Sequence, residues 1–464
     1  MRRILATVSV FLLLCCCNRI DPNYFPSDDN AEHVDWASAL ACVFDDSVIP
    51  EIHVSVSVDE WNRLLAEYDK NSGTKEYISC DVRHIKGDEN IQIPNAGLRL
   101  RGNTSRRRPE GRSGQKHQSA NPDWHHCHFC LNYHYYEKNP FHTLHGVRRV
   151  DLKWFKDDPA YVREMYCYDL FRRFGVWTAV NDVYCRLWLR VGNGDEAYFG
   201  VYEMMEHIDR SYLLARRKQF GSADGNLWKC SHGADLRKTN ADFGTDDNGK
   251  EHVYELKEGP EGIEAAKDQL ANFITKLNTQ SGEELFKWLE SVMDIDLFLR
   301  TYAVNVAVGM WDDYWNNSNN YYLYLTPAGK VYFIPFDYDN TIGTSHVCGV
   351  QKDSGRQSPL QWGQNNNPLV LKVLQNPEWK SKYMSYLKEL CVEENGLNTE
   401  QAAALRIRKW QGAIGLYVPN DTGEDMVVED RPADWGNHKE YRLLSGDNNN
   451  FFRIKALSVS AMWP

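Results

Sequence analysis

The segment from Asn305 to Ser345 constrains the fold more than any other part of this sequence. It reads NVAVGMWDDYWNNSNNYYLYLTPAGKVYFIPFDYDNTIGTS, in which two runs of aromatic and β-branched residues flank a turn with Pro327 and Gly329. This pattern predicts a β-hairpin with strands over 320–325 and 330–334. The open ends of antiparallel strands lie about 5 Å apart. The chain that enters the hairpin therefore lies beside the chain that leaves it.

Acidic and amide side chains crowd both open ends of this predicted hairpin. The entering loop carries Asp312, Asp313 and several asparagines, Asn320 among them, and the leaving loop carries Asp337 and Asp339. Carboxylates held this close repel one another unless a cation lies between them, and oxygen ligands suit Mg²⁺, Mn²⁺ or Ca²⁺. We predict a metal site here. The alternative is a plain pair of polar turns, because acids are also common in ordinary turns.

Length and charge narrow the class of protein. A chain of 464 residues is long enough for two lobes or for two to three domains. Its aromatic content of 12% is high for a disordered chain. The net charge of −11 gives no basic surface for phosphodiester backbones, so we do not expect a nucleic-acid partner.

The N-terminus has the pattern of an export signal. Two arginines follow Met1, residues 4–14 are mostly apolar, and three cysteines come next. The apolar run is too short for a permanent membrane span. Leu14 lies three residues before Cys17, as in the signal of bacterial lipoproteins, so Cys17 is the predicted lipidation site. Cys16 is the alternative, and a plain cleaved signal peptide is another. The prediction is a protein attached to a membrane through an N-terminal lipid.

Periodicity divides the chain into four segments and predicts the α+β class. These are a lipoprotein signal peptide over 1–17, a tether over 18–45, a β-rich half over 46–259 and a helical half over 260–464. Alternating apolar residues predict strands, and spacing near 3.6 residues predicts helices. The main predicted strands are 51–57, 77–82, 96–101, 183–190 and 197–204, and the main predicted helices are 159–174, 263–277, 283–293 and 295–310.

Two further segments carry groups that bind ligands in other proteins. Residues 103–116, NTSRRRPEGRSGQK, combine Arg, Gly, Ser and Thr, which suits either a phosphate-binding turn or a solvated basic loop. Residues 125–130, HHCHFC, contain zinc-ligand types. Neighbours on a strand face opposite sides, and no second cluster with zinc spacing follows, so we favour core or network residues over a zinc site.

Taken in order, a series of short blocks resembles the spore-coat protein H (CotH) kinase-like family, in the branch common among lipoproteins of Gram-negative gut bacteria. The resemblance extends from about Ile49 to Leu390. The blocks are LRLRGNTSR at 98–106, Arg163 in its helix, FGVY at 199–202 followed by Glu206, GNLWK at 225–229, YELK at 254–257, WD at 311–312, NNYYLY at 319–324 and PFDYD at 335–339.

This resemblance implies a remote, atypical protein-kinase-like fold with a β-rich N-lobe and a helical C-lobe. It implies transfer of the γ-phosphoryl group of ATP to a protein Ser or Thr, with Mg²⁺ or Mn²⁺ as cofactor. By position, Asp312 resembles the catalytic Asp, Asp337 the principal metal ligand and Asn320 a second ligand, with Asp339 as an additional candidate. It also implies a place in the bacterial cell envelope, at the outer membrane.

The lysine that pairs with the phosphates stays open at this point. Many members of the family have it just after the Arg-Gly-Asn block, where this chain has an insertion. Lys229, Lys257 and Arg101 are the candidates, and Glu206 is the candidate carboxylate partner.

Two other functions fit parts of the sequence. The first is a haloacid-dehalogenase-type phosphatase, because a strand followed by Asp337, Asp339 and Thr341 matches its Asp-x-Asp-x-Thr nucleophile motif. Pro335 interrupts that strand, and no pattern of a parallel sheet follows. The second is a non-catalytic lipoprotein that uses the same scaffold to bind a nucleotide, a metal, a glycan or a partner protein.

Overall fold

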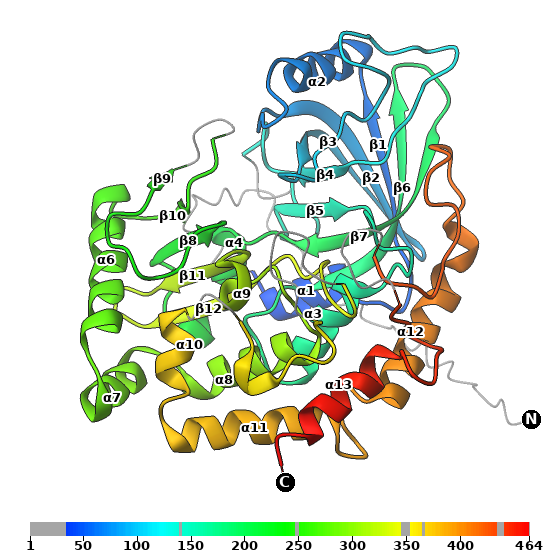
Figure 1. Cartoon of the computed structure of the whole chain (residues 1–464). Coiled ribbons are helices and arrows are strands. Elements are labelled where there is room, and N and C mark those ends of the chain that lie inside the picture. The colour runs from blue at the N-terminus through cyan, green and yellow to red at the C-terminus, as the bar shows by residue number, and fades with distance from the viewer. Residues whose placement is uncertain are drawn as a thin grey trace, which may run out of the picture.

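The computed structural model describes residues 34–138, 142–245, 250–344, 353–363, 367–433 and 440–463. Within them the chain is a mixed α+β protein, which confirms the predicted class. A closed barrel of seven strands lies at the upper right of Figure 1, a five-stranded sheet lies at the left, and most helices lie below the two. The predicted lipidation sites, Cys17 and Cys16, fall outside the described residues.

The barrel has the strand order β1-β2-β3-β4-β5-β7-β6 and closes where β1 runs parallel to β6. All other neighbours in the barrel are antiparallel. Alternate apolar side chains of the strands fill the interior, as in small closed barrels generally. The strands are β1 (Glu51–Val56), β2 (Ile78–Lys86), β3 (Glu89–Arg101), β4 (His128–Asn132), β5 (Arg149–Lys153), β6 (Asp182–Val191) and β7 (Ala197–Glu206).

The second sheet contains the predicted hairpin. Strands β11 (Tyr321–Leu325) and β12 (Val331–Pro335) pair antiparallel, with Tyr321 opposite Pro335 and Leu325 opposite Val331. The sheet order is β12-β11-β8-β10-β9. The remaining strands of this sheet are β8 (Asn226–Cys230), β9 (Phe243–Thr245) and β10 (Tyr254–Glu258).

The sheets do not divide at the predicted boundary between residues 259 and 260. Strands β8, β9 and β10 were expected with the β-rich half, but they join the hairpin because β8 pairs with β11 along its full length. Leu227 and Trp228 of β8 are fully buried, and both belong to the core that the helices share. Burial against the helical half decides which sheet these strands enter.

The helices after residue 260 form where periodicity predicts them, and α3 begins later than expected. The predicted helix over 159–174 starts at Arg163, because the Asp158 carboxylate accepts hydrogen bonds from the backbone N–H groups of Val162 and Arg163 and fixes the turn before it. The helices are α2 (Val58–Lys70), α3 (Arg163–Arg173), α4 (Arg210–Ala215), α5 (Arg217–Phe220), α6 (Ile263–Thr279), α7 (Gly282–Val292), α8 (Ile295–Ala307), α9 (Tyr314–Asn317), α10 (Pro368–Val373), α11 (Pro377–Cys391), α12 (Glu400–Ile414) and α13 (Phe451–Ser460).

The predicted tether over 18–45 is wrong in its last part, where residues form helix α1 (Trp36–Val43). The Asp35 side chain accepts a hydrogen bond from the Ser38 backbone N–H and caps this helix. Val43 is buried in the barrel core, so the helix is attached to the globular part. Of all helices in the described ranges, none is both long and apolar enough to cross a membrane.

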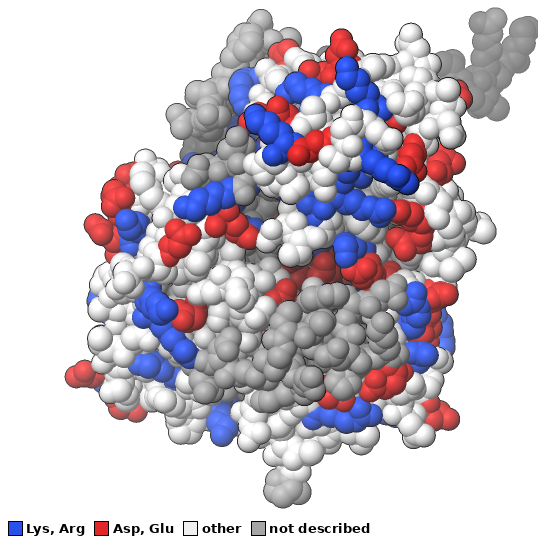
Figure 2. All heavy atoms as spheres, turned by 45° about the horizontal axis from the view of Figure 1, so that its top comes forward, with Lys and Arg blue, Asp and Glu red and all other residues white. Residues whose placement is uncertain are grey.

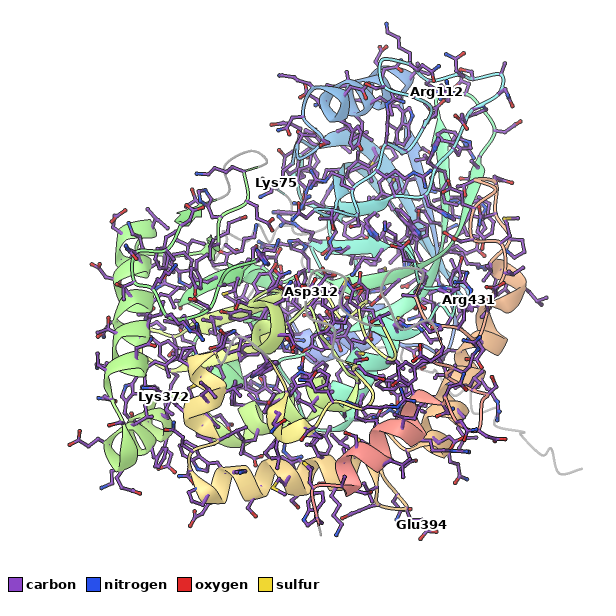
Figure 3. All side chains as sticks on the ribbon, viewed as in Figure 1. Lys75, Arg112, Asp312, Lys372, Glu394 and Arg431 are labelled. Atoms are coloured by element: carbon purple, nitrogen blue, oxygen red, sulfur yellow. The ribbon has the colours of Figure 1, made fainter. Side chains whose placement is uncertain are left out.

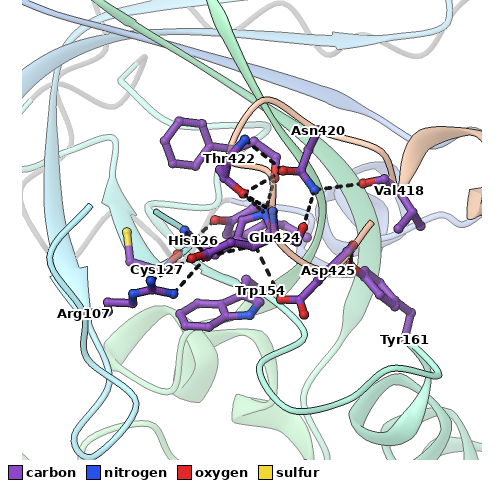
Figure 4. Close-up of polar contacts among 12 residues, drawn as sticks. Arg107, His126, Cys127, Trp154, Tyr161, Val418, Asn420, Thr422, Glu424 and Asp425 are labelled. Carbon is purple, nitrogen blue, oxygen red and sulfur yellow. Dashed lines mark hydrogen bonds and ion pairs between the residues drawn. The ribbon is translucent and has the colours of Figure 1, made fainter. Parts of the chain in front are cut away.

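A C-terminal loop, residues 418–425, lies across the barrel and contacts the histidine-rich run (Figure 4). Glu424 forms a bidentate ion pair with Arg107, at 2.9 and 2.7 Å, and accepts a hydrogen bond from the His126 backbone N–H. The His126 ring contacts the Phe199 carbonyl at 2.8 Å and stacks on Trp154. His126 thus belongs to a structural network, as the sequence indicated.

The space around two glycines, Gly225 before β8 and Gly412 in α12, predicts opposite effects for their substitution by alanine. In Gly225→Ala the new Cβ would meet the Leu325 carbonyl and lie 2.9 Å from Thr326 Cα, so backbone must move. We expect a loss of about 1–3 kcal/mol in the free energy of unfolding. Gly412 in α12 is exposed with open space around it, so Gly412→Ala should gain about 0.5–1 kcal/mol. Urea unfolding measures both, and equal effects would contradict this account.

Candidate active site

A buried lysine joins the barrel to the helical half. Lys153, at the end of β5, forms an ion pair with Glu164 in the first turn of α3. Its Nζ lies 2.6 Å from Asp337 Oδ1 and 3.8 Å from Asp339 Oδ2, in the loop that leaves the hairpin. Lys153 and Glu164 are 4% and 3% exposed, so water solvates neither charge. One cation therefore faces three carboxylates from two separate elements.

Strand geometry explains why Lys153 faces this site. Val150 and Leu152 of β5 point into the barrel core. Side chains alternate along a strand, so Asp151 and Lys153 point outward. Lys153 there meets α3 and the loop after the hairpin. Glu164 lies in the first turn of α3, where the helix dipole favours a carboxylate.

The loop after β12 is held to α3 through its backbone. The Asp337 N–H donates a hydrogen bond to the Tyr168 hydroxyl at 3.0 Å, and the Tyr338 N–H donates to Glu164 Oε1 at 3.2 Å. Asp337 has φ of +62°, in the left-handed region that non-glycine residues rarely adopt. These contacts fix the direction of the Asp337 carboxylate toward Lys153.

Electrostatics sets the charge on each group in this centre. Burial alone would lower the pKa of Lys153, but Asp337 and Glu164 raise it well above its usual range. Burial alone would raise the pKa of Asp337, but Lys153 and Arg101 lower it to about 2. Burial and then repulsion by Asp337 raise the pKa of Asp339 well above its usual range. In the absence of a cation these effects favour the protonated, neutral form of Asp339.

The residues at this centre fit a divalent cation. One carboxylate oxygen from each of Glu164, Asp337 and Asp339 lies within 4.8 Å of the others. An all-oxygen set of three carboxylates suits Mg²⁺ or Mn²⁺ rather than a softer metal. A bound cation would favour the ionised form of Asp339, which can then act as a ligand. The structure thus places Asp337 and Asp339 together as predicted and adds Glu164 to them.

Asp312 lies in the loop that enters the hairpin, and Figure 3 places it near the middle of the molecule. Its carboxylate accepts hydrogen bonds from Asn317 Nδ2 at 2.6 Å and from Asn319 and Asn320 Nδ2 at 3.1 Å. Burial raises the pKa of Asp312, and the negative charge of Asp337 raises it further. The predicted metal ligand Asn320 directs its amide N–H groups to the backbone carbonyl and the carboxylate of Asp312.

The backbone of this loop gathers the amides around Asp312. Asp313 caps the short helix α9, and Ser318 and Asn320 have φ of +50° and +53°. Such left-handed residues turn the chain sharply, which brings asparagines from both sides of the turn onto one carboxylate. The asparagines that made this segment look like a polar loop therefore hold the Asp312 carboxylate in place.

The other predicted cations occupy different positions. Arg101 on β3 lies close to the centre: its Nε is 3.0 Å from Asp151 Oδ2, and its guanidinium lies over the Phe336 ring. Lys229 on β8 pairs with Glu251 at 3.2 Å, and Lys257 on β10 pairs with the buried Glu255.

Glu255 also links the two halves of the molecule. It contacts Lys75, which precedes β2, at 3.3 Å, and Figure 3 shows Lys75 between the barrel and the second sheet. The space-filling view shows acidic side chains gathered in a hollow near the middle of the face, with basic side chains above them (Figure 2). Charges of both signs therefore line the boundary between the two halves.

The predicted pairing of Glu206 with one of these cations is wrong. Glu206, at the end of β7, forms a buried bidentate ion pair with Arg216 at 2.6 and 2.7 Å. It also accepts hydrogen bonds from the backbone and side-chain amides of Asn181. Arg216 follows α4 and lies ten residues after Glu206 in the sequence, so a local contact satisfies this carboxylate.

Sequence reasoning missed Lys153 and Glu164. The segment Arg149–Lys153 alternates charged and apolar residues, and Glu164 stands directly beside Arg163, one of the residues that carry the family resemblance. An alternating strand that ends in Lys and is followed by a helix with Glu in its first turn is the available signal. It is weak, because such patterns are also typical of solvated strands and helices.

The fold and this centre define an α+β protein that joins one buried lysine to three carboxylates, a composition suited to a metal and to phosphate groups. The family model described as "CotH kinase protein" matches residues 98–442. That is more than half of the chain, which therefore belongs to the CotH kinase family, and the resemblance noted in the sequence is confirmed.

Three proteins of Rhizopus delemar are similar to this chain. "Spore coat protein homolog 1" is 21% identical over 75% of this chain and 51% of its own length. "Invasin CotH3" is 21% identical over 76% of this chain and 54% of its own length. "Invasin CotH7" is 24% identical over 82% of this chain and 59% of its own length. The chain thus spans little more than half the length of these relatives.

The position of Glu206 predicts a structural rather than a ligand-binding role. Glu206→Gln removes one charge of a buried pair, which should lower the free energy of unfolding by about 3–5 kcal/mol. At temperatures where the variant is folded, titration with ATP and Mg²⁺ should give the same result as for the wild type. Glu264→Gln, at an exposed pair on α6, is the matched control and should change stability by less than about 1 kcal/mol. Normal stability with lost binding of nucleotide would contradict this role for Glu206.

Proposed function

We propose that this protein is an atypical kinase that transfers the γ-phosphoryl group of ATP to a Ser or Thr of a protein, with Mg²⁺ or Mn²⁺ as cofactor. One observation carries the proposal: Lys153 on a barrel strand is ion-paired with Glu164 on a helix and also contacts Asp337 after the hairpin. Protein kinases combine a strand Lys, a helix Glu and a metal-binding Asp in the same way.

The architecture supports the same proposal. In a two-lobed interpretation the barrel and α3 correspond to the N-lobe, and the second sheet with α6 to α13 corresponds to the C-lobe. Asp312 then precedes the hairpin and Asp337 follows it, both at its open end on the C-lobe side, as catalytic Asp and metal-binding Asp do in kinases. Membership of the CotH kinase family is in line with this interpretation.

The residues of this chain divide the chemistry among them. In the proposed reaction Lys153 binds phosphate oxygens while Glu164 orients its ammonium group. Asp337 and Asp339, with Glu164 near them, would hold a divalent cation, which neutralises charge on the β- and γ-phosphates when bound. Asp312 accepts the proton of the acceptor hydroxyl. At the same time the hydroxyl oxygen bonds to the γ-phosphorus, and the bond between the γ-phosphorus and the ADP oxygen breaks. The raised pKa of Asp312 suits a group that takes up a proton.

The phosphatase alternative does not fit the geometry. Strand β12 belongs to an antiparallel hairpin, whereas a phosphatase nucleophile of that type requires a parallel sheet. The Asp337 carboxylate is also in contact with Lys153, which limits its reach as a nucleophile. A non-catalytic protein with this scaffold would keep the nucleotide site and lack transfer, so the two experiments below separate it from a kinase.

We also propose that the chain is anchored by an N-terminal lipid in a bacterial cell envelope, at the outer membrane. The support is the arginine-led apolar run and the cysteines that end at Cys17. The acceptor in this proposal is a protein outside the cytoplasm. Globomycin-sensitive processing and palmitate labelling that depend on Cys17 would test the anchor, with Cys16→Ala as the control variant.

Binding of nucleotide should depend on the three-carboxylate centre. Calorimetric titration of ATP with Mg²⁺ or Mn²⁺ should show binding, and addition of EDTA should weaken it. Asp337→Ala removes the acid that contacts Lys153 and should abolish metal-dependent binding. Asp268→Ala, at an exposed acid on α6, should bind like the wild type. Normal binding of Mg-ATP by Asp337→Ala would show that the site is misassigned.

Transfer should depend on Asp312 after binding has occurred. Asp312→Asn keeps the shape of the side chain but removes the proton acceptor, so the affinity for Mg-ATP should persist while kcat falls by about 10²–10⁴-fold. Transfer of ³²P from ATP to a panel of envelope proteins measures kcat, with Asp268→Asn as control. If Asp312→Asn retained full transfer, Asp312 would not be the base. If the wild type bound Mg-ATP and transferred nothing, the non-catalytic alternative would be favoured.

A further inference from the structure

A second group of metal-ligand side chains lies at one rim of the barrel, away from the site above. Cys42 is in the last turn of α1, Glu89 begins β3, and His145 is in the turn before β5. One ligand atom from each residue lies within 4.8 Å of the other two. His145 Nε2 is 2.9 Å from Glu89 Oε2. Three separate segments therefore bring a thiol, an imidazole and a carboxylate to one place.

The backbone around this group holds the three segments together. The Lys86 ammonium donates hydrogen bonds to the carbonyls of Cys42 and Asp45, each at 2.8 Å, which fixes the end of α1 to β2. Gly146 has φ of +93°, and a Cβ there would lie 3.0 Å from Val34 Cγ1. The turn that carries His145 thus packs closely against the chain entering α1. Packing of these segments therefore holds the three ligand side chains close together.

A buried histidine beneath this group supplies an independent observation. Both ring nitrogens of His84 are buried and lack a hydrogen-bond partner among the described residues. Buried polar atoms of this kind usually have a partner. His84 lies opposite Ile91 in the β2–β3 register, and Glu89 is two residues from Ile91, so His84 and Glu89 share one face of the sheet.

His84 is also within electrostatic range of the group. Burial lowers the pKa of His84 to about 4, and the charges of Glu89 and His145 act on it as well. The imidazole is therefore neutral at physiological pH, the form in which histidine binds metals. An ion at the rim, or water bound to it, would give this ring the polar partner that it lacks.

The chemistry of the donors selects the class of metal. Thiolate and imidazole ligands favour Zn²⁺ and related transition metals, whereas the all-oxygen set of Glu164, Asp337 and Asp339 favours Mg²⁺ or Mn²⁺. We propose that Cys42, Glu89 and His145 form a Zn²⁺ site at the barrel rim, with the His84 imidazole directed to it from inside. The ion would tie helix α1 to the barrel.

Another cluster is less suited to a cation. Cys130, Asp151 and His207 also lie within 4.8 Å of one another, but Asp151 is ion-paired with Arg101. The charge of Arg99 acts on Asp151 too. The positive field of two guanidinium groups opposes a metal ion there, so the rim group is the better candidate.

Cobalt spectroscopy of the full chain tests the proposal. Chelator-stripped, reduced protein is titrated with Co²⁺, and a thiolate-to-cobalt charge-transfer band in the near ultraviolet reports a Cys ligand. Zn²⁺ is then added to displace Co²⁺ and to measure affinity by competition. The variants are Cys42→Ser, Glu89→Gln, His145→Gln and His84→Phe, with Asp88→Asn as a control at an exposed acid of the same β2–β3 turn. Circular dichroism verifies that each variant is folded.

We expect the band in the wild type and in Asp88→Asn, and its loss in Cys42→Ser. Glu89→Gln and His145→Gln should weaken Zn²⁺ binding at least about tenfold. Loss of a group that only orients a metal ligand already costs about that much affinity. His84→Phe should weaken it less than either. Zn²⁺ should raise the melting temperature of the wild type but not that of Cys42→Ser. Absence of the band in the wild type, or its persistence in Cys42→Ser, would overturn the proposal.

Discussion

The structure depends on a buried ammonium group that is shared between two parts of the chain. Lys153 enters from the barrel, while Glu164 and Asp337 approach from α3 and from the loop after the hairpin. A buried charge is costly unless it is paired, and removal of one partner from such a pair costs about 3–5 kcal/mol. The barrel and the second sheet therefore cannot separate freely, because separation would leave the charges of Lys153 and Asp337 without their partners.

This constraint also organises the polar groups around the centre. Arg101 and His207 both contact Asp151, which stands two residues before Lys153 on the same face of β5. Across the boundary, Glu255 is contacted by Lys257 from its own strand and by Lys75 from the barrel side. Alternating charges thus line both sides of the boundary. A polyphosphate with its cation carries charge of both signs and can replace such contacts without leaving groups unpaired.

Local patterns in the sequence predicted the hairpin and its acids, and long-range pairing decided the rest. Strands β11 and β12 follow directly from residues 320–334, because a turn with Pro and Gly fixes the register between adjacent runs. Asp337 and Asp339 meet because both lie in the same loop. Lys153 could not be found in this way, since its partner Asp337 is 184 residues away and no local rule links them. Glu206 was misassigned for a different reason: its partner Arg216 is only ten residues away, but the pairing depends on how α4 packs.

The C-terminal loop across the barrel has a consequence for how this protein is made. Arg107 and Glu424 are separated by 317 residues, so the barrel reaches its final set of contacts only after nearly the whole chain exists. Contacts this distant in sequence form slowly, because closing a long loop costs entropy before it returns any stabilisation. A partly synthesised chain would contain all seven barrel strands, which end at Glu206, but would lack the loop that contacts Arg107 and His126. The loop over residues 418–425 is therefore among the last segments of the chain that can add contacts to the barrel.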